Sequence, residues 1–118
     1  MKSTIEQPWI ETGYEIFSKE GPAGLKVEHI ARLVGKSKSS FYHLFADTEI
    51  FQEKLLAYHQ DRAVVIAAQA RACKSMVPDM LNLLIKVKPD LLFNRQLRVH
   101  RTNPEFQQCF EKANGLVE

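Results

Sequence analysis

Two short apolar helical patterns separated by a glycine constrain this chain more than any other feature of its sequence. One face of residues 27–34 is apolar at the helical spacing i, i+3, i+4 and i+7, at Val27, Ile30, Ala31 and Val34. Gly35 follows directly and suits the left-handed conformation that ends a helix. Ser37 can then cap a second helix, whose inward-facing residues are Phe41, Leu44 and Phe45. Two short helices joined by a tight turn that contains glycine predict a helix-turn-helix.

The outer face of the second helix is small, polar and cationic. No acidic residue occurs between Glu28 and Asp47. The same window contains permanent cations and two histidines, which are Arg32, Lys36, Lys38, His29 and His43. A helix that enters the major groove of DNA must bring side chains to base edges without carboxylates that repel phosphates. The pattern therefore indicates a phosphate-facing surface, and the alternative is chance clustering of charge on a solvated face.

The segments on either side also read as helices. A first helix is expected from Pro8 to about Lys19, and Gly13 on its apolar side allows another helix to approach closely. Asp47 can cap a long helix that begins at about Thr48 and extends to residue 74. At 1.5 Å per residue this helix spans about 40 Å, which is long enough to connect two parts of the molecule.

Proline positions divide the rest of the chain into further helices. Pro78 opens one, Pro89 interrupts or restarts it, and Asn103-Pro104 begins the last, before Gly115. The sequence therefore predicts an all-α protein. We expect a helix-turn-helix DNA-binding domain over residues 1–47 and a helical ligand or regulatory domain over residues 48–118.

Composition excludes several classes of protein. The 118 residues are 45% hydrophobic and 25% charged, which is typical of a soluble globular domain, and no apolar stretch is long enough for a membrane span. Cys73 and Cys109 do not form a disulfide framework, so reduced thiols in the cytoplasm are expected. The four histidines show no HExxH spacing, and there is no nucleophile elbow. We expect no metal, no cofactor and no enzymatic activity.

Several runs of the sequence resemble the tetracycline-repressor (TetR) family of transcriptional regulators. These are residues 10–17, Gly21, residues 27–31 and residues 34–51. Residues 35–45 match the signature Gly-x-Ser-Lys-x-x-(Leu/Phe)-Tyr-x-x-Phe at the expected distance from the first helix. The strong resemblance covers about residues 8–60. It implies a homodimeric regulator, usually a repressor, that binds a palindromic operator and is released by a small-molecule inducer.

The resemblance also implies which side chains contact DNA. Ser37, Lys38, Ser39, Ser40, Tyr42 and His43 lie on the expected recognition helix. We assign phosphates to Lys38 and Tyr42, which are one turn apart, and base edges to Ser39, Ser40 and His43. This chain departs from the family pattern at three further contact positions. Lys26 stands where Thr or Ser is common, Lys36 where Val is common, and Thr48 where Lys is common.

The chain is also shorter than the family's usual length of around 200 residues, and it lacks the C-terminal helices through which members dimerise. A truncated product is the interpretation we favour, and dimerisation through another surface is the alternative. A missing partner helix is expected to leave part of the apolar surface between Leu92 and Phe110 exposed. Two alternative functions without DNA binding remain, a helical small-molecule-binding protein and a helical protein-interaction module.

Overall fold

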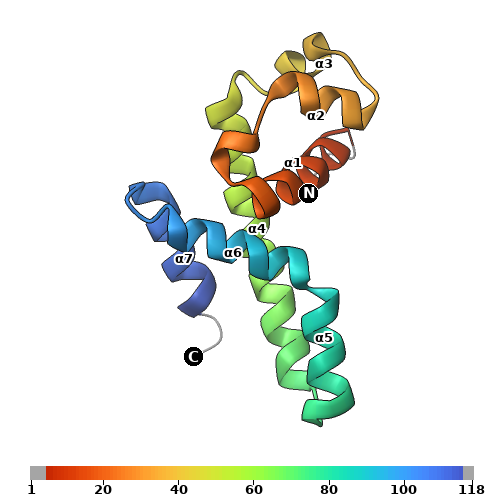
Figure 1. Cartoon of the computed structure of the whole chain (residues 1–118), viewed down its shortest axis with the longest axis vertical. Helices are drawn as coiled ribbons and strands as arrows, with labels where there is room; N and C mark the ends of the chain where they lie inside the picture. Colours follow the sequence, from red (N-terminus) through yellow and green to blue (C-terminus); the bar gives the residue numbers. More distant parts are fainter. Residues whose placement is uncertain (1–4, 116–118) are drawn as a thin grey trace.

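Seven α-helices and two short helical turns make up the part of the chain that the structure, a computed structural model, describes, which is residues 5–115 (Figure 1). The helices are α1 (Gln7–Glu20), α2 (Val27–Val34), α3 (Lys38–Leu44), α4 (Thr48–Ala72), α5 (Leu81–Lys86), α6 (Lys88–Val99) and α7 (Pro104–Gly115). The turns are η1 (Pro22–Gly24) and η2 (Met76–Met80). The prediction of an all-α protein is therefore confirmed. None of the helices within residues 5–115 combines the length and apolarity needed to cross a membrane.

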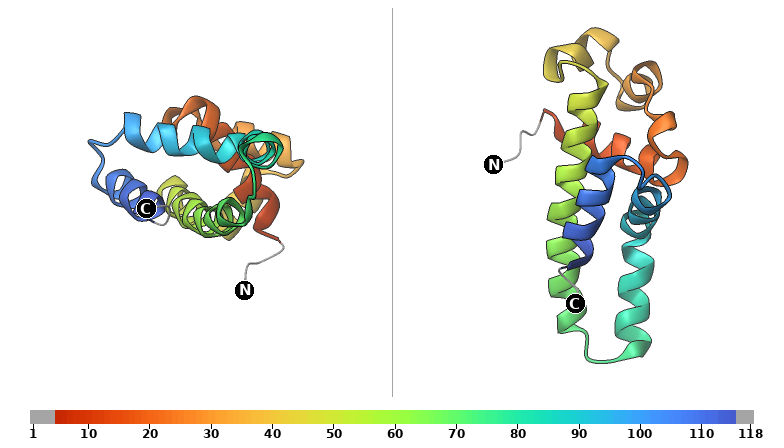
Figure 2. Two further views of the ribbon diagram at one scale, coloured as in Figure 1. Left: turned by 90° about the horizontal axis from the view of Figure 1, so that it is seen from below. Right: turned by 90° about the vertical axis from the view of Figure 1, so that its left-hand side faces the viewer.

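Helix α4 runs along the long axis of the molecule, whose principal extents are 47 × 30 × 26 Å. Helices α1–α3 lie at one end of this axis, and α5 lies beside the distal half of α4 at the other end (Figure 1). Helix α6 packs between these two ends against α1, and α7 lies alongside α4 (Figure 2). As a result, the first helix of the chain contacts both the segment that follows it and a helix about eighty residues later.

The local signals in the sequence define the helix ends as expected. Ser37 Oγ accepts a hydrogen bond from the Ser40 backbone N–H at 3.2 Å, and Asp47 Oδ1 accepts one from Ile50 N at 2.9 Å. Gly35 has φ = 80°, in the left-handed region, and its N–H bonds back to α2. These caps stop α2 and restart the chain as α3 after a three-residue turn.

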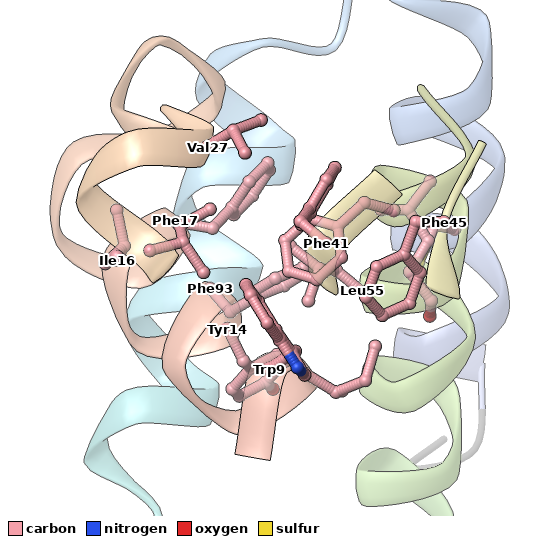
Figure 3. Close-up of a cluster of buried hydrophobic side chains, with 14 of the residues drawn as sticks. Trp9, Tyr14, Ile16, Phe17, Val27, Phe41, Phe45, Leu55 and Phe93 are labelled. Carbon is pink, nitrogen blue, oxygen red and sulfur yellow. The ribbon is translucent and has the colours of Figure 1, made fainter. Parts of the chain in front are cut away.

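A cluster of aromatic side chains forms the core (Figure 3). The Phe41 ring on α3 contacts Trp9 of α1 and Phe51 of α4, with ring centroids 5.7 and 5.2 Å apart. Phe93 of α6 joins the same cluster by stacking on Tyr14, with the two centroids 4.4 Å apart. The core is therefore continuous across residue 47. The proposed division into two domains stays a prediction, and its outermost residues, 1–4 and 116–118, lie outside the described residues.

The expectation that part of the apolar surface between Leu92 and Phe110 is exposed holds at Val99, which is 58% exposed. Phe93, Leu97 and Phe106 are at most 2% exposed because α6 packs against both α1 and α7. The exposed apolar side chains lie instead mainly on η2, α5 and the distal half of α4. They include Val64, Val65, Met76, Val77, Leu81, Leu84 and Ile85. No helix among residues 5–115 covers this end of the molecule as α1 and α7 cover α6.

Gly13 is the site of close helix packing that the sequence predicts. A Cβ atom at this position would overlap the Phe51 ring, lying 2.6 Å from Cε2, and would touch Leu55 of the same helix, α4. The Phe51 ring is fully buried between Phe41 and Phe45, so it cannot move aside without disturbing both. The absence of a side chain at residue 13 therefore allows α1 to pack closely on α4.

Replacing Gly13 by alanine is therefore expected to destabilise the protein. Ala is the better helix former, but the overlap with Phe51 requires α1 and α4 to separate, and overpacking of this kind costs about 1–3 kcal/mol. The matched control is Gly115→Ala, because a Cβ at that position meets no atom within 4 Å. Urea unfolding should show a loss of stability for Gly13→Ala alone, and equal stability of the two variants would contradict the packing.

Candidate nucleic-acid interface

Helix α3 is fixed in place by its buried aromatic side chains. Phe41 lies within α3 and Phe45 directly follows the helix. Both are 0% exposed, and their ring centroids lie 5.1 Å apart. Phe45 also contacts Trp9 and Phe51, so both rings bind α3 to α1 and α4. The buried side of α3 is therefore fixed. Leu44 also packs partly against the core, whereas Lys38, Ser39, Tyr42 and His43 are exposed.

The side chains assigned to DNA lie on the surface. Lys26, Lys36, Ser37, Lys38, Ser39, Tyr42, His43 and Thr48 are exposed, and Ser40 is half-buried. Two of these residues also have structural roles: the Ser37 hydroxyl caps α3, and it lies 3.2 Å from the Ser40 hydroxyl. Thr48 is flanked in the sequence by Asp47 and Glu49, which add two negative charges at the start of α4.

An acidic side chain just outside residues 29–46, the segment without acidic residues, partly neutralises this surface. The Glu28 carboxylate on α2 accepts a hydrogen bond from Lys38 Nζ at 3.0 Å. This bond lowers the pKa of Glu28 and raises the pKa of Lys38. Neither Lys36 nor Lys26 forms an ion pair with any residue of the described part of the chain. Lys36 is therefore an unpaired cation next to α3.

A groove of about 660 Å³ lies between the start of α1 and the outer face of α3. Its walls consist of Ile5, Pro8, Trp9, Val34, Lys36, Ser39, Ser40, His43 and Leu44. The groove thus brings together Lys36 and three of the residues assigned to base edges. It does not include Tyr42, Lys26 or Thr48, so the predicted contact residues do not form one continuous pocket.

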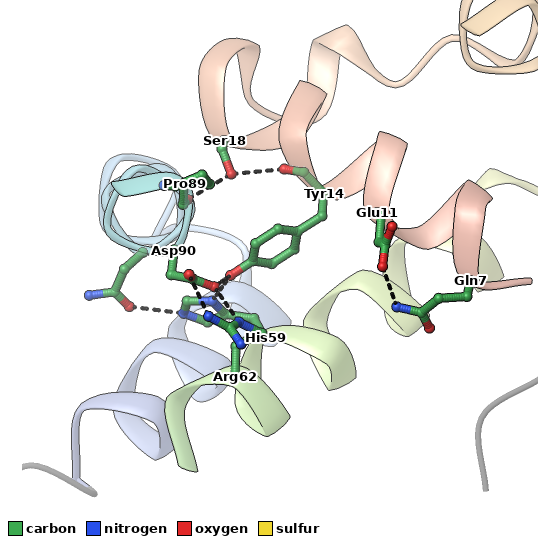
Figure 4. A network of polar contacts seen from close by, with 9 residues as sticks. Gln7, Glu11, Tyr14, Ser18, His59, Arg62, Pro89 and Asp90 are labelled. Carbon is green, nitrogen blue, oxygen red and sulfur yellow. Dashed lines mark hydrogen bonds and ion pairs between the residues drawn. The ribbon is translucent and has the colours of Figure 1, made fainter. Parts of the chain in front are cut away.

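A buried polar network, which the sequence did not reveal, connects α1, α4 and α6 (Figure 4). The Tyr14 hydroxyl donates to Asp90 Oδ1 at 2.7 Å and lies 2.7 Å from His59 Nδ1. Arg62 of α4 binds both oxygens of Asp90, through Nε at 3.1 Å and Nη2 at 3.2 Å. Burial, together with the Asp90 charge, raises the pKa of Tyr14, which keeps this hydroxyl protonated.

This network has one hydrogen atom too few for its contacts when His59 is neutral. Because the Tyr14 proton goes to Asp90, His59 Nδ1 must donate to the Tyr14 oxygen. His59 Nε2 then presents a lone pair to Asn94 Oδ1, 3.3 Å away. Burial lowers the pKa of His59, although the Asn94 contact and the Asp90 charge oppose this shift. His59 is therefore buried in its neutral form, with one contact that protonation would complete.

Comparison of the chain with family models, curated proteins and solved structures finds no match. The assignment of α3 as a DNA-contacting helix therefore depends on the sequence motif and on the geometry described above.

The lowered pKa of His59 predicts that mild acid destabilises the fold. Unfolded His59 takes up its proton near pH 6.5 (about the ordinary value), whereas the folded protein takes it up only at lower pH. The unfolded state therefore binds more protons between these two values. The contribution of neutral His59 is fully present above the unfolded pKa and declines as the pH falls through the folded pKa. The slope from this group is at most about 1.4 kcal/mol per pH unit.

Urea unfolding between about pH 7.5 and 5.5 measures this loss, in the range where most carboxylates stay ionised. The His59→Gln variant keeps a polar side chain but no titration, so its stability should depend less on pH. His43→Gln, at an exposed position, is the matched control and should retain the wild-type pH dependence. An unchanged dependence in His59→Gln would exclude His59 as its source.

Proposed function

We propose that this protein is a sequence-specific DNA-binding transcriptional regulator in which α2 and α3 act as a helix-turn-helix. The observation that carries the proposal is the two-sided character of α3. Its inner side is fixed by Phe41, while its outer side exposes Ser39, Tyr42 and His43 within a segment free of carboxylates. Such a helix can enter a major groove without repelling phosphates.

We assign different roles to the different contacts. Lys36 and Tyr42 bind phosphates, which positions the helix and makes affinity depend on salt. Ser39, Ser40 and His43 line the protein groove next to α3. In the proposed complex they contact base edges, where they can distinguish sequences. Lys38 contributes only part of its charge because Glu28 is its partner. Ser37 serves mainly as the cap of α3.

Regulation follows the scheme that the tetracycline-repressor resemblance implies. Two copies of the chain, acting in the cytoplasm, bind a palindromic operator with their α3 helices about 34–36 Å apart. A small-molecule inducer among the C-terminal helices releases the repressor by favouring a different separation. The packing of α6 on α1, with the Tyr14–Asp90 hydrogen bond, supports such coupling because a shift of α6 changes contacts made by the first helix. The inducer must bind the two arrangements with different affinity.

A helical protein-interaction module without DNA binding is the second candidate. Leu81, Leu84 and Ile85 on α5 are at least 44% exposed and follow the i, i+3, i+4 spacing of a helix that packs on a partner. Selection of bound duplexes from a random pool separates the two candidates. An enriched palindrome supports the regulator, whereas a pool without enrichment and an affinity independent of salt support the interaction module.

Variants of the α3 surface test the division of roles. Lys36→Ala and Tyr42→Ala should weaken binding to the selected operator and to random duplex equally, and Lys36→Ala should reduce the salt slope by about one. Ser39→Ala and His43→Ala should lose about 1–3 kcal/mol on the operator alone. Salt-titrated fluorescence anisotropy measures both effects. Equal losses on both duplexes for all four variants would refute the assignment of base contacts.

Breaking the Glu28–Lys38 ion pair is expected to strengthen binding to DNA, in contrast to the variants above. Glu28→Gln removes the carboxylate next to Lys38, so binding to every duplex should become tighter and the salt slope steeper. Glu111→Gln is the matched control, because it makes the same change of charge on α7 at an exposed residue without an ion pair. Affinities of both variants for random duplex, measured against salt, compare the two. Equal changes in both would show that only the overall charge matters.

A further inference from the structure

The groove next to α3 has the two-part lining of a small-molecule site. Its apolar lining includes Pro8, Trp9, Val34 and Leu44, and its polar lining is an ammonium group, two hydroxyl groups and an imidazole. Its volume of about 660 Å³ lies within the range of roughly 300–1,000 Å³ that is usual for sites of small ligands. A ligand that fits this lining has a substantial apolar part and a polar end.

The charge of the polar lining determines the kind of polar end. No carboxylate lines the groove, and its one permanent cation, Lys36, has no acidic partner among residues 5–115. The smaller pocket of about 380 Å³ between α1 and α2 differs in this respect. It contains Glu15 and Glu20, and its Lys19 already binds Glu15 at 3.2 Å. The larger groove is thus the described pocket whose charge favours an anion.

We propose that the groove binds an amphipathic carboxylate or sulfonate. The apolar part lies on Trp9, Val34 and Leu44, where it displaces water from apolar surface. The anionic group lies at the polar lining, where Lys36 supplies the charge and Ser39 a hydroxyl donor.

An occupant of this groove covers Ser39, Ser40 and His43, the residues that the proposed function assigns to base edges. The ligand and DNA therefore exclude each other directly, without any change in the arrangement of the helices. This competition rests on the proposed function, whereas binding of the anion depends only on the groove.

Trp9 provides a local signal for the test, because it is the only tryptophan of the chain and lies in the groove. Anilinonaphthalene sulfonate serves as the fluorescent anionic probe, and energy transfer from Trp9 reports probe bound near it. Probe that binds to the exposed apolar residues of α5, at the far end of the molecule from α3, gives much weaker transfer (Figure 1). We expect saturable transfer that decanoate abolishes by displacing the probe, and transfer that never saturates would overturn the proposal.

The role of Lys36 is tested by comparing two competitors of equal chain length. Decanoate should displace the probe from the wild-type protein at a roughly tenfold lower concentration than decanol, because only decanoate binds the ammonium group. In Lys36→Gln this difference should disappear, with the affinity for decanol unchanged. Lys19→Gln, also at an exposed lysine of this half of the molecule, should behave as wild type. Equal potency of the two competitors in the wild type, or an unchanged difference in Lys36→Gln, would overturn the proposal.

A second pair of variants tests whether the anionic group of the ligand binds next to Ser39. Ser39→Glu should weaken binding of the anionic probe at least as strongly as Lys36→Gln, whereas Ser39→Gln, of nearly the same size, should bind it close to the wild-type affinity. Circular dichroism confirms that both variants fold. Equal binding of the probe by the two would contradict the assigned position of the anion.

Competition with DNA is then measured separately, as decanoate-dependent release of a labelled duplex. Release with the concentration dependence of probe displacement supports direct exclusion, and a ternary complex of protein, decanoate and duplex overturns it. If the protein binds no duplex at all, the proposed function fails, while the probe experiments still decide whether the groove binds anions.

Discussion

The burial of the Phe41 ring is the interaction on which the exposed face of α3 depends. One aromatic side chain on a helix of seven residues contacts α1 through Trp9 and α4 through Phe51. A helix this short has little stability of its own, so tertiary packing must hold it. Because Phe41 and Phe45 take the inner side, the polar residues of the same segment are directed outward. The chemistry available at the surface is thus a consequence of aromatic packing in the core.

Local rules predicted the secondary structure well. The caps at Ser37 and Asp47 and the left-handed Gly35 are properties of a residue and its neighbours, and all three occur as the sequence indicates. The exposure of the α3 residues also follows from helical spacing alone. These features required no knowledge of distant contacts.

Features that depend on pairs of distant segments could not be predicted. The Glu28–Lys38 ion pair joins two helices across the turn, and the charge window that began after Glu28 left it out. Tyr14 lies 45 residues from His59 and 76 residues from Asp90, its two partners in the buried network. No spacing rule relates such positions. The burial of Phe93 and Leu97 and the exposed apolar surface on η2 and α5 were not predicted for the same reason, because the contact of α6 with α1 has no local signal.

Helix α1 contributes aromatic side chains to the packing of both α3 and α6. Phe93 of α6 stacks on Tyr14 and Phe17 of α1, with ring centroids 4.4 and 4.3 Å apart. Trp9, also on α1, supports α3. Excision of the first 47 residues would expose the Phe93 ring to water, because Tyr14 and Phe17 stack on it. Helix α1 thus joins α3 and α6 through one continuous core.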